Sequence, residues 1–343
     1  MLPLIYNLSR SDLRAACATA GGQAWRADQI WRWLYTRHVE TWDAMHNLPN
    51  ALRTALASRF ELTPFSLANS QGDPDTARKL LLRLRDGECI EIVLLADHAR
   101  HTLCVSSQVG CRFACAFCAS GQAGFRRQLE TGEIVGETLA ATRMLGSRPN
   151  NIVFMGIGEP LDNYDAVLAA IRILNDPDGL NIGARHITIS TNGIIPGIER
   201  LADEGLQVEL AVSLHAPNDT VRNRLMPVNR RFPLPELLSS CARYTQRTKR
   251  IITFEYTLMR GINDSVAQAQ ELADRLKTFP SRVNLIPLSP VSGFDGQPSA
   301  PGVAGHFLTA LAKAGINATM RNSQGQRIQA ACGQLRLQHL KAT

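Results

Sequence analysis

The amino-acid sequence predicts an α/β protein whose main part is a barrel or partial barrel of parallel strands. Strand-like and helix-like segments alternate from about residue 102 onwards, and repeated βα units build a parallel sheet. A tryptophan-rich helical segment comes first, and an Asp-Gly turn between two strand-like runs follows it. A doubly wound sheet is the alternative fold.

The first part of the chain, residues 1–62, is expected to form a small helical domain that contains all 4 tryptophans. Residues 25–35 place apolar side chains at helical spacing, with Arg26 and Arg32 between them. This pattern favours an amphipathic helix whose aromatic stripe lies in the core, and direct stacking on RNA bases is the alternative. A second short helix is expected at residues 51–59.

Residues 63–96 are expected to form a β-hairpin extension. Two strand-like runs, 79–85 and 88–94, flank the turn at Asp86-Gly87. Glu91 alternates with isoleucines on the second run, and a lone carboxylate on a strand usually faces solvent. Glu91 gains functional interest only if the hairpin lies over a site.

The rest of the chain, residues 97–343, is assigned to a partial (βα)6 barrel with a C-terminal segment. Its strands are expected at 102–106, 151–155, 186–190, 208–214, 251–258 and 282–287, with a last one at 317–320. Its helices are expected at 133–145, 164–174, 198–202, 234–244 and 266–277. The Pro- and Gly-rich stretch 287–305 is expected to be a long surface loop.

The 343-residue chain is 20% charged and 45% hydrophobic, a balance that excludes wholesale disorder. No run of about 18 apolar residues occurs, so no membrane span is expected. The first residues lack an apolar run with a cleavage site, which predicts no secretory signal and a cytoplasmic protein. The net charge is +7 and most basic residues are Arg, which suits nucleic acid, although codon usage in a GC-rich genome gives the same excess.

Three cysteines, Cys111, Cys115 and Cys118, form a C-x3-C-x2-C array directly after a predicted strand. Thiols this close leave one cysteine over in any disulfide pairing, so metal ligation is the natural alternative. Three thiolates suit a 4Fe–4S cluster with one iron left uncapped. A structural zinc completed by Cys104 or a histidine is the other possibility.

The cysteine array resembles that of radical S-adenosylmethionine (SAM) enzymes, which carry it near the start of a βα barrel. The likeness extends to the RlmN/Cfr family of RNA adenine methyltransferases and spans nearly the whole chain. The segments similar to that family are 25–29, 103–111, 154–161, 189–191, 213–219 and 330–335.

This resemblance implies one 4Fe–4S cluster held by three cysteines (Cys111, Cys115 and Cys118) and by SAM, with two SAM molecules used per turnover. The implied SAM contacts are Gly158, Glu159, Ser190, Ser213, Leu214, His215 and Ser289. Ser289 stands where the family has Asn, and Leu288 stands where it has an aromatic residue, which indicates a divergent subgroup.

The resemblance also implies the catalytic residues. Cys332 would carry a methyl group that becomes a radical, adds to the base and forms a covalent protein–RNA adduct. Glu91 would accept the ring proton, and Cys104 would attack the sulfur of Cys332, leaving a Cys104–Cys332 disulfide to be reduced. A single cysteine without such a pattern is more often a small buried hydrophobe.

The expected activity is methylation of carbon 2 of an adenosine in 23S rRNA, and in tRNA as for RlmN. Carbon 8 or another RNA substrate is the alternative. The expected partners are RNA and an electron donor such as flavodoxin or ferredoxin, with the enzyme a monomer. A radical SAM enzyme acting on a peptide or small molecule, and a zinc-stabilised RNA-binding protein, are the competing hypotheses.

Overall fold

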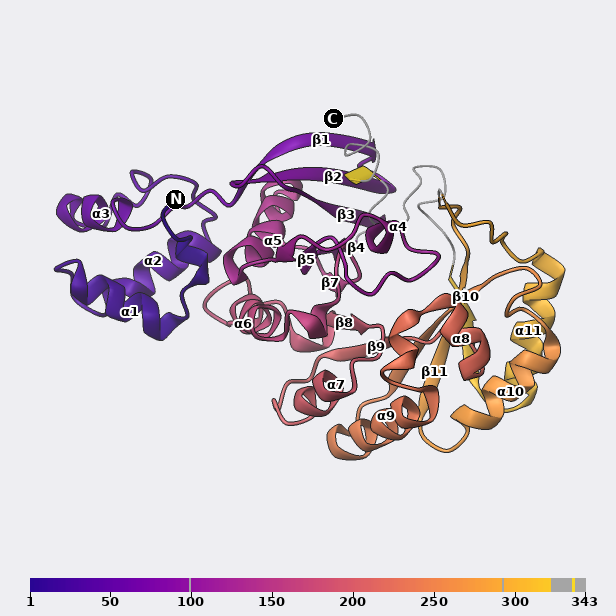
Figure 1. Cartoon of the computed structure of the whole chain (residues 1–343). Helices are drawn as coiled ribbons and strands as arrows, with labels where there is room; N and C mark the ends of the chain where they lie inside the picture. The colour runs from indigo at the N-terminus through magenta and orange to yellow at the C-terminus, as the bar shows by residue number, and fades with distance from the viewer. Residues whose placement is uncertain (99, 292, 322–334, 337–343) are drawn as a thin grey trace.

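One mixed sheet organises the chain in the computed structural model, which describes residues 1–98, 100–291, 293–321 and 335–336 (Figure 1). The sheet has 10 strands in the order β1-β2-β3-β4-β7-β8-β9-β10-β11-β12. Its strands are β1 (Phe65–Asp73), β2 (Ala77–Leu84), β3 (Cys89–Asp97), β4 (Arg100–Cys104), β7 (Asn151–Phe154), β8 (Ile187–Thr191), β9 (Glu209–Ser213), β10 (Ile252–Leu258), β11 (Ser281–Pro287) and β12 (Asn317–Met320).

From β4 to β12 every neighbouring pair is parallel, and these strands lie in the order of the sequence. Right-handed βα crossovers in sequential order place all the connecting helices on one face. Figure 1 shows these helices following the outside of the curved sheet. The predicted partial barrel is therefore confirmed, because a doubly wound sheet reverses its strand order. The outer helices are α5 (Thr131–Leu145), α6 (Tyr164–Asn175), α7 (Ile195–Leu201), α9 (Leu234–Thr248), α10 (Val266–Leu276) and α11 (Pro301–Lys313).

The first four strands of the sheet are antiparallel. The predicted hairpin is β2–β3, and its turn places Gly87 at φ +89°, a conformation that glycine adopts without strain. β1 was not predicted, because its sequence is polar and its side chains are mostly exposed. A separate small ladder joins β5 (Gln108–Val109) to β6 (Arg127–Gln128).

The N-terminal segment folds as the short helix η1 (Ile5–Asn7) and the helices α1 (Arg10–Thr19), α2 (Arg26–Tyr35) and α3 (Asn50–Ala57). α1 was not expected, although Ser9 and Asp12 form a capping box at its start. On α2, Trp31 is buried and belongs to the same hydrophobic cluster as barrel residues such as Ile152. Trp25 lies at the surface, 50% exposed.

Short helices fill the connections at the carboxyl ends of the strands. They are α4 (Ala119–Gln122), η2 (Pro160–Asp162), α8 (Asp219–Leu225) and η4 (Pro227–Arg230). A further short helix, η3 (Ala184–His186), directly precedes β8. The loop expected at 287–305 is shorter than predicted, because α11 begins at Pro301. Proline is well suited to the first turn of a helix, since its fixed φ is already helical and its missing N–H is not needed there.

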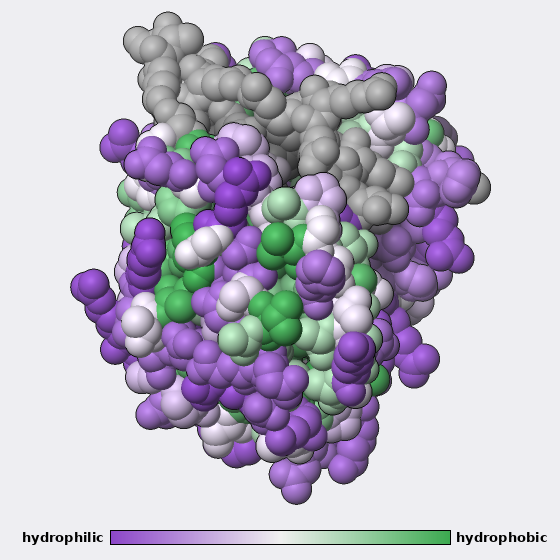
Figure 2. Space-filling model, turned by 90° about the vertical axis from the view of Figure 1, so that its right-hand side faces the viewer, coloured by the Kyte–Doolittle hydropathy of each residue, from purple (hydrophilic) through white to green (hydrophobic). Residues whose placement is uncertain are grey.

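Figure 2 looks onto the side of the molecule that carries α10 and α11, where hydrophobic residues are interspersed with hydrophilic ones. Val266 and Val303 are among the exposed hydrophobic residues of these two helices. Within the described ranges, none of the helices has the length and apolar character needed to cross a membrane.

Candidate active site

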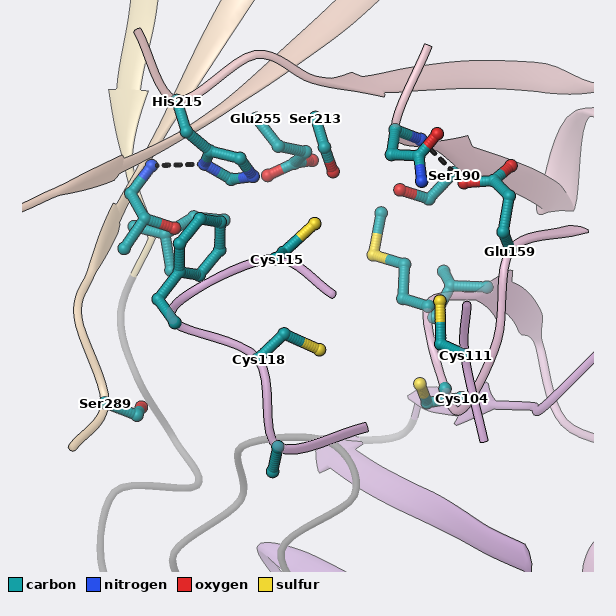
Figure 3. Close-up of a pocket in the computed structure, with 18 of the residues that line it drawn as sticks. Cys104, Cys111, Cys115, Cys118, Glu159, Ser190, Ser213, His215, Glu255 and Ser289 are labelled. Carbon is teal, nitrogen blue, oxygen red and sulfur yellow. Dashed lines mark hydrogen bonds between the residues drawn. The ribbon is translucent and has the colours of Figure 1, made fainter. Parts of the chain in front are cut away.

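A cavity of about 430 Å³ lies at the carboxyl ends of the parallel strands, where barrels place their active sites (Figure 3). Strands β3, β4 and β7 to β11, and connections that follow them, contribute to its wall. Most of the residues singled out from the sequence line it: Cys104, Cys111, Cys115, Cys118, Gly158, Glu159, Ser190, Ser213, His215 and Ser289.

The loop that carries the three clustered cysteines is held by main-chain contacts at its start and in its middle. It starts at Gly110, whose φ is +79° and whose Cβ, if present, would lie 1.7 Å from the carbonyl oxygen of Gly124. Only glycine fits there. Further along, the N–H of Ala116 donates to the carbonyl of Leu225 on α8 at 2.9 Å. The thiols are therefore presented by a fixed backbone.

The three thiols line the cavity from two sides and point toward its interior (Figure 3). Within the described ranges, no three His, Cys, Asp or Glu side chains lie close enough together to hold one metal ion. Three thiolates that face one cavity are the donor set of a 4Fe–4S cluster with one open iron, whereas a closed structural zinc site needs a fourth ligand. Burial raises the pKa of the Cys111 thiol to about 12 and that of Cys115 well above its usual value. Bound iron would lower these pKa values again, because a coordinated thiol is held as thiolate.

Glu159 is a buried carboxylate in the connection after β7, directly before η2, and it lies on the same side of the cavity as Cys111 (Figure 3). Its Oε2 accepts the N–H of Asn192 at 2.7 Å, and its Oε1 accepts the N–H of Leu161 at 3.0 Å. Gly158 precedes it at φ +108°, packed so tightly that a Cβ would lie 2.6 Å from the Cβ of Gln108. Burial raises the pKa of Glu159 to about 7, so this anchored carboxyl group is suited to a cationic partner.

His215 follows β9 and is buried against the ring of Phe117, whose centroid is 4.7 Å away. The main-chain N–H of Thr257 donates to His215 Nδ1 at 2.9 Å, so the neutral ring carries its proton on Nε2. Burial and then the nearby Arg222 charge lower the pKa of His215 to about 3. The imidazole therefore offers an N–H donor and stays neutral at physiological pH.

Glu255 on β10 is a cavity residue that the sequence analysis missed. It is paired in register with Ser213 on β9 and with Asn284 on β11, whose Nδ2 donates to Glu255 Oε2 at 3.0 Å. Burial raises its pKa. A carboxylate inside the apolar run 252–258 was the signal available in the sequence, because a buried strand seldom carries one without a function.

Cys104 ends β4, and its register partner on β3 is Val93, another cavity residue. Glu91 lies two residues earlier on the same strand and therefore on the same face. It does not line the cavity in this structure. Its carboxylate is 2% exposed, lies 3.5 Å from Lys79 Nζ and accepts the main-chain N–H of Arg336.

Two further predicted site residues lie elsewhere. Leu214 is fully buried and does not line the cavity, and its N–H donates to the carbonyl of Glu255 at 3.0 Å. Cys332, and with it the expected disulfide to Cys104, lies outside the described residues. Leu335 and Arg336, which follow it, are described. Leu335 packs on Leu81 and Cys89, and Arg336 forms an ion pair with Glu88 at 3.2 Å.

Two family models match the chain. The model of the radical SAM superfamily matches residues 105–273, which include the cysteine loop and the cavity from β7 to α10. The model of the ribosomal RNA large subunit methyltransferase N-terminal domain matches residues 5–62.

Known proteins resemble the chain over nearly its whole length. A protein of Geobacillus kaustophilus named "Probable dual-specificity RNA methyltransferase RlmN" is 45% identical, with 99% of this chain and 94% of that protein covered. A protein of Moorella thermoacetica with the same name is 47% identical, with 97% of this chain and 96% of that protein covered. The crystal structure of a radical SAM methyltransferase from Sphaerobacter thermophilus is similar with a TM-score of 0.93 at 45% identity, covering 97% of this chain and 98% of that one.

Proposed function

The chain belongs to the RlmN family of radical SAM RNA methyltransferases, and we propose that it methylates carbon 2 of an adenosine in 23S rRNA through a cysteine-bound methyl group. A tRNA adenosine is a second substrate. The observation that carries this proposal is the convergence of Cys104 and the C-x3-C-x2-C thiols on one cavity that also contains a buried carboxylate, Glu159.

One set of cavity residues would bind the iron–sulfur cluster, and another would bind SAM. Cys111, Cys115 and Cys118 would hold three irons of a 4Fe–4S cluster, and Glu159 would bind the ammonium group of SAM. When bound and reduced, the cluster would supply with SAM a carbon-centred radical. Ser190 and Ser213 offer hydroxyl groups, and His215 offers its Nε2–H, to the polar atoms of SAM.

A ring carbon of adenine between two nitrogens is a poor nucleophile, so ordinary methyl transfer from SAM does not reach it. The chain's own sulfur atoms solve this problem. Cys332 receives a methyl group from one SAM, loses one hydrogen of that group to the radical from a second SAM, and bonds to the base through the resulting methylene.

Release of the product requires a base and a second thiol. The radical adduct would pass its unpaired electron to a one-electron acceptor such as the oxidised iron–sulfur centre, and Glu91 accepts the ring proton. The Cys104 thiolate then attacks the sulfur of Cys332, so that the carbon–sulfur bond breaks, the methylene carbon takes up a proton to become the methyl group, and a disulfide forms. An external reductant then restores both thiols. The position of Cys104 on the cavity wall, and the docking of Leu335 and Arg336 beside Glu91, support this division of roles.

RNA contact is assigned to the helical domain at residues 1–62 and to Arg-rich loops such as Arg126-Arg127 and Arg230-Arg231. The net charge of +7 suits a polyanion. We place the enzyme in the cytoplasm as a monomer that takes electrons from a flavodoxin or ferredoxin. Ser289 lines the cavity where the family has Asn, and because of this difference another RNA substrate is the alternative.

Anaerobic purification tests the proposal directly. The protein should be brown, contain about four irons and bleach in air. Methyl transfer to RNA should disappear in Cys332→Ala while reductive cleavage of SAM continues. A colourless protein with one zinc would contradict the proposal, and so would full methylation by Cys332→Ala.

A further inference from the structure

Arg222 on α8 is a fully buried arginine whose hydrogen bonds all go to neutral groups. Its Nη1 donates to Asn229 Oδ1 at 2.8 Å, and its Nη2 donates to the carbonyls of Asn192 at 2.6 Å and Ser213 at 3.2 Å. Its Nε is buried and has no hydrogen-bond partner in the described residues. Three contacts thus position the guanidinium, but none of them neutralises its charge.

No carboxylate in the described part of the chain forms an ion pair with Arg222. The nearest acid along the same helix, Asp219, is engaged elsewhere: its Oδ1 accepts from Asn229 Nδ2 at 2.7 Å and from the Leu234 N–H at 2.8 Å. A buried charge without an opposite partner costs several kcal/mol, on the order found when one member of a buried pair is removed. Arginine is almost never fully buried unless it is paired, so Arg222 calls for a negative partner.

The surroundings of Arg222 place that partner at the cysteine loop. Asn192 and Ser213, whose carbonyls it binds, both line the cavity. Leu225, one helical turn further along α8, accepts the N–H of Ala116, which lies between Cys115 and Cys118. Burial lowers the pKa of Arg222 to about 10, and negative charge at Cys115, Asp219 and Cys241 acts in the opposite direction, with Cys115 the largest of the three. The helix therefore ties the cation to the loop that presents the thiols.

We propose that Arg222 is the fixed counter-charge of the iron–sulfur centre, a positioning residue whose buried guanidinium offsets the negative charge that the thiolates bring and that reduction increases. This inference rests on the proposed cluster. Three thiolates on a 4Fe–4S core carrying two positive charges leave one net negative charge, and the electron accepted from the donor makes it two. A buried cation held nearby favours the reduced form more than the oxidised one, so it raises the reduction potential.

The test compares three variants of the full chain, each reconstituted anaerobically with iron and sulfide and titrated with dithionite while the reduced cluster is followed by electron paramagnetic resonance. Arg222→Gln removes the charge and keeps a hydrogen-bond donor. Arg222→Lys keeps the charge. Arg224→Gln removes an exposed charge from the same helix and is the matched control.

The proposal predicts that Arg222→Gln lowers the potential or fails to retain the cluster, whereas Arg222→Lys loads and stays near the wild type. Arg224→Gln should match the wild type. Equal potentials in the wild type and Arg222→Gln would overturn the proposal. The proposal would also be overturned if Arg222→Gln and Arg222→Lys lowered the reduction potential equally or both lost the cluster. Arg222 would then act through its hydrogen bonds and not through its charge. A wild-type protein that loads no cluster would instead defeat the proposed function, and it would do so before any variant is compared.

Discussion

The main-chain N–H of Arg336 donates a hydrogen bond to the carboxylate of Glu91, joining the end of the chain to the hairpin. Lys79 Nζ lies 3.5 Å from the same carboxylate, and Leu335 packs on Leu81 close by. Glu91 shares its strand face with Val93, which lines the cavity. Leu335 and Arg336 are therefore anchored beside the wall of the candidate active site.

Glu91→Gln should slow methyl transfer by about 10²- to 10⁴-fold, the usual effect of losing a general base. Reductive cleavage of SAM should continue, because the amide removes only the proton acceptor. Denaturing gels of reactions with RNA would show the protein–RNA adduct accumulating. Glu88→Gln is the control, since Glu88 pairs with the Arg336 side chain but is given no role in proton transfer. Equal rates for the wild type and Glu91→Gln would remove Glu91 from the mechanism.

Cys104→Ala and Cys332→Ala should fail at different steps. Cys332→Ala has no methyl carrier, so it forms no adduct with RNA. Cys104→Ala can form the adduct but cannot resolve it, so mass spectrometry should find RNA fragments on Cys332. Cys241→Ala, at a buried cysteine of α9 outside the cavity, should retain activity. An active Cys104→Ala enzyme would mean that another thiol, or none, resolves the adduct.

SAM binding to Glu159 should tighten as the pH rises through about 7, because burial raises the pKa of this carboxyl to about 7 and only the ionised form attracts the ammonium group. Glu159→Gln should bind SAM about 10- to 100-fold more weakly above this pH, the worth of a charge-assisted hydrogen bond, and without the pH trend. Equilibrium titration between about pH 6 and about pH 8 measures both effects. A SAM affinity that is flat over this range in the wild type would contradict the assignment.

The raised pKa of Glu159 also affects the stability of the cofactor-free protein. A carboxyl whose folded pKa is raised binds more protons when folded than when unfolded, between its ordinary value of 4.5 and about 7. The contribution of Glu159 to the free energy of unfolding should therefore fall as the pH rises through this window and level off above it. Thermal unfolding should show the wild type losing stability relative to Glu159→Gln as the pH rises from 4.5 to about 7, with no further change above that pH.

Gly110→Ala should abolish cluster binding, because the new Cβ would lie 1.7 Å from the carbonyl oxygen of Gly124 in a backbone of positive φ. Gly205→Ala is the matched control: its φ is +67°, but nothing lies within 4 Å of the added carbon. That variant should lose only about 1–2 kcal/mol, the cost of a left-handed conformation. Iron content and thermal unfolding distinguish the two. Full iron content in Gly110→Ala would show that the turn before Cys111 is not needed.

The barrel was predictable because its strands and helices carry strong, regularly alternating hydrophobic patterns. β1 was not, because a polar edge strand has neither periodicity nor burial to reveal it. α8 was missed for a related reason: it is 7 residues long and its central residue, Arg222, is a buried charge that reads in the sequence as a surface one. In both β1 and α8, contacts with distant parts of the chain determine the structure, and the local sequence does not reveal them.

The site was predictable where a motif follows a strand, since the carboxyl ends of parallel strands meet at one edge. Ser190, Ser213 and His215 reach the cavity for that reason. Leu214 does not, because neighbouring residues at the end of a strand point to opposite sides. Glu255 escaped notice because it lies within a strand, where its orientation depends on the pairing register with β9 and β11.

The central claim is that a thiol of this chain delivers a methyl group to a ring carbon of adenine in RNA. Mass mapping of modified adenosines in total RNA, from cells with the intact gene, without it, and with it restored as Cys332→Ala, tests this most directly. The account predicts 2-methyladenosine in 23S rRNA and tRNA only in the cells with the intact gene. Unchanged methyladenosines in all three would contradict it.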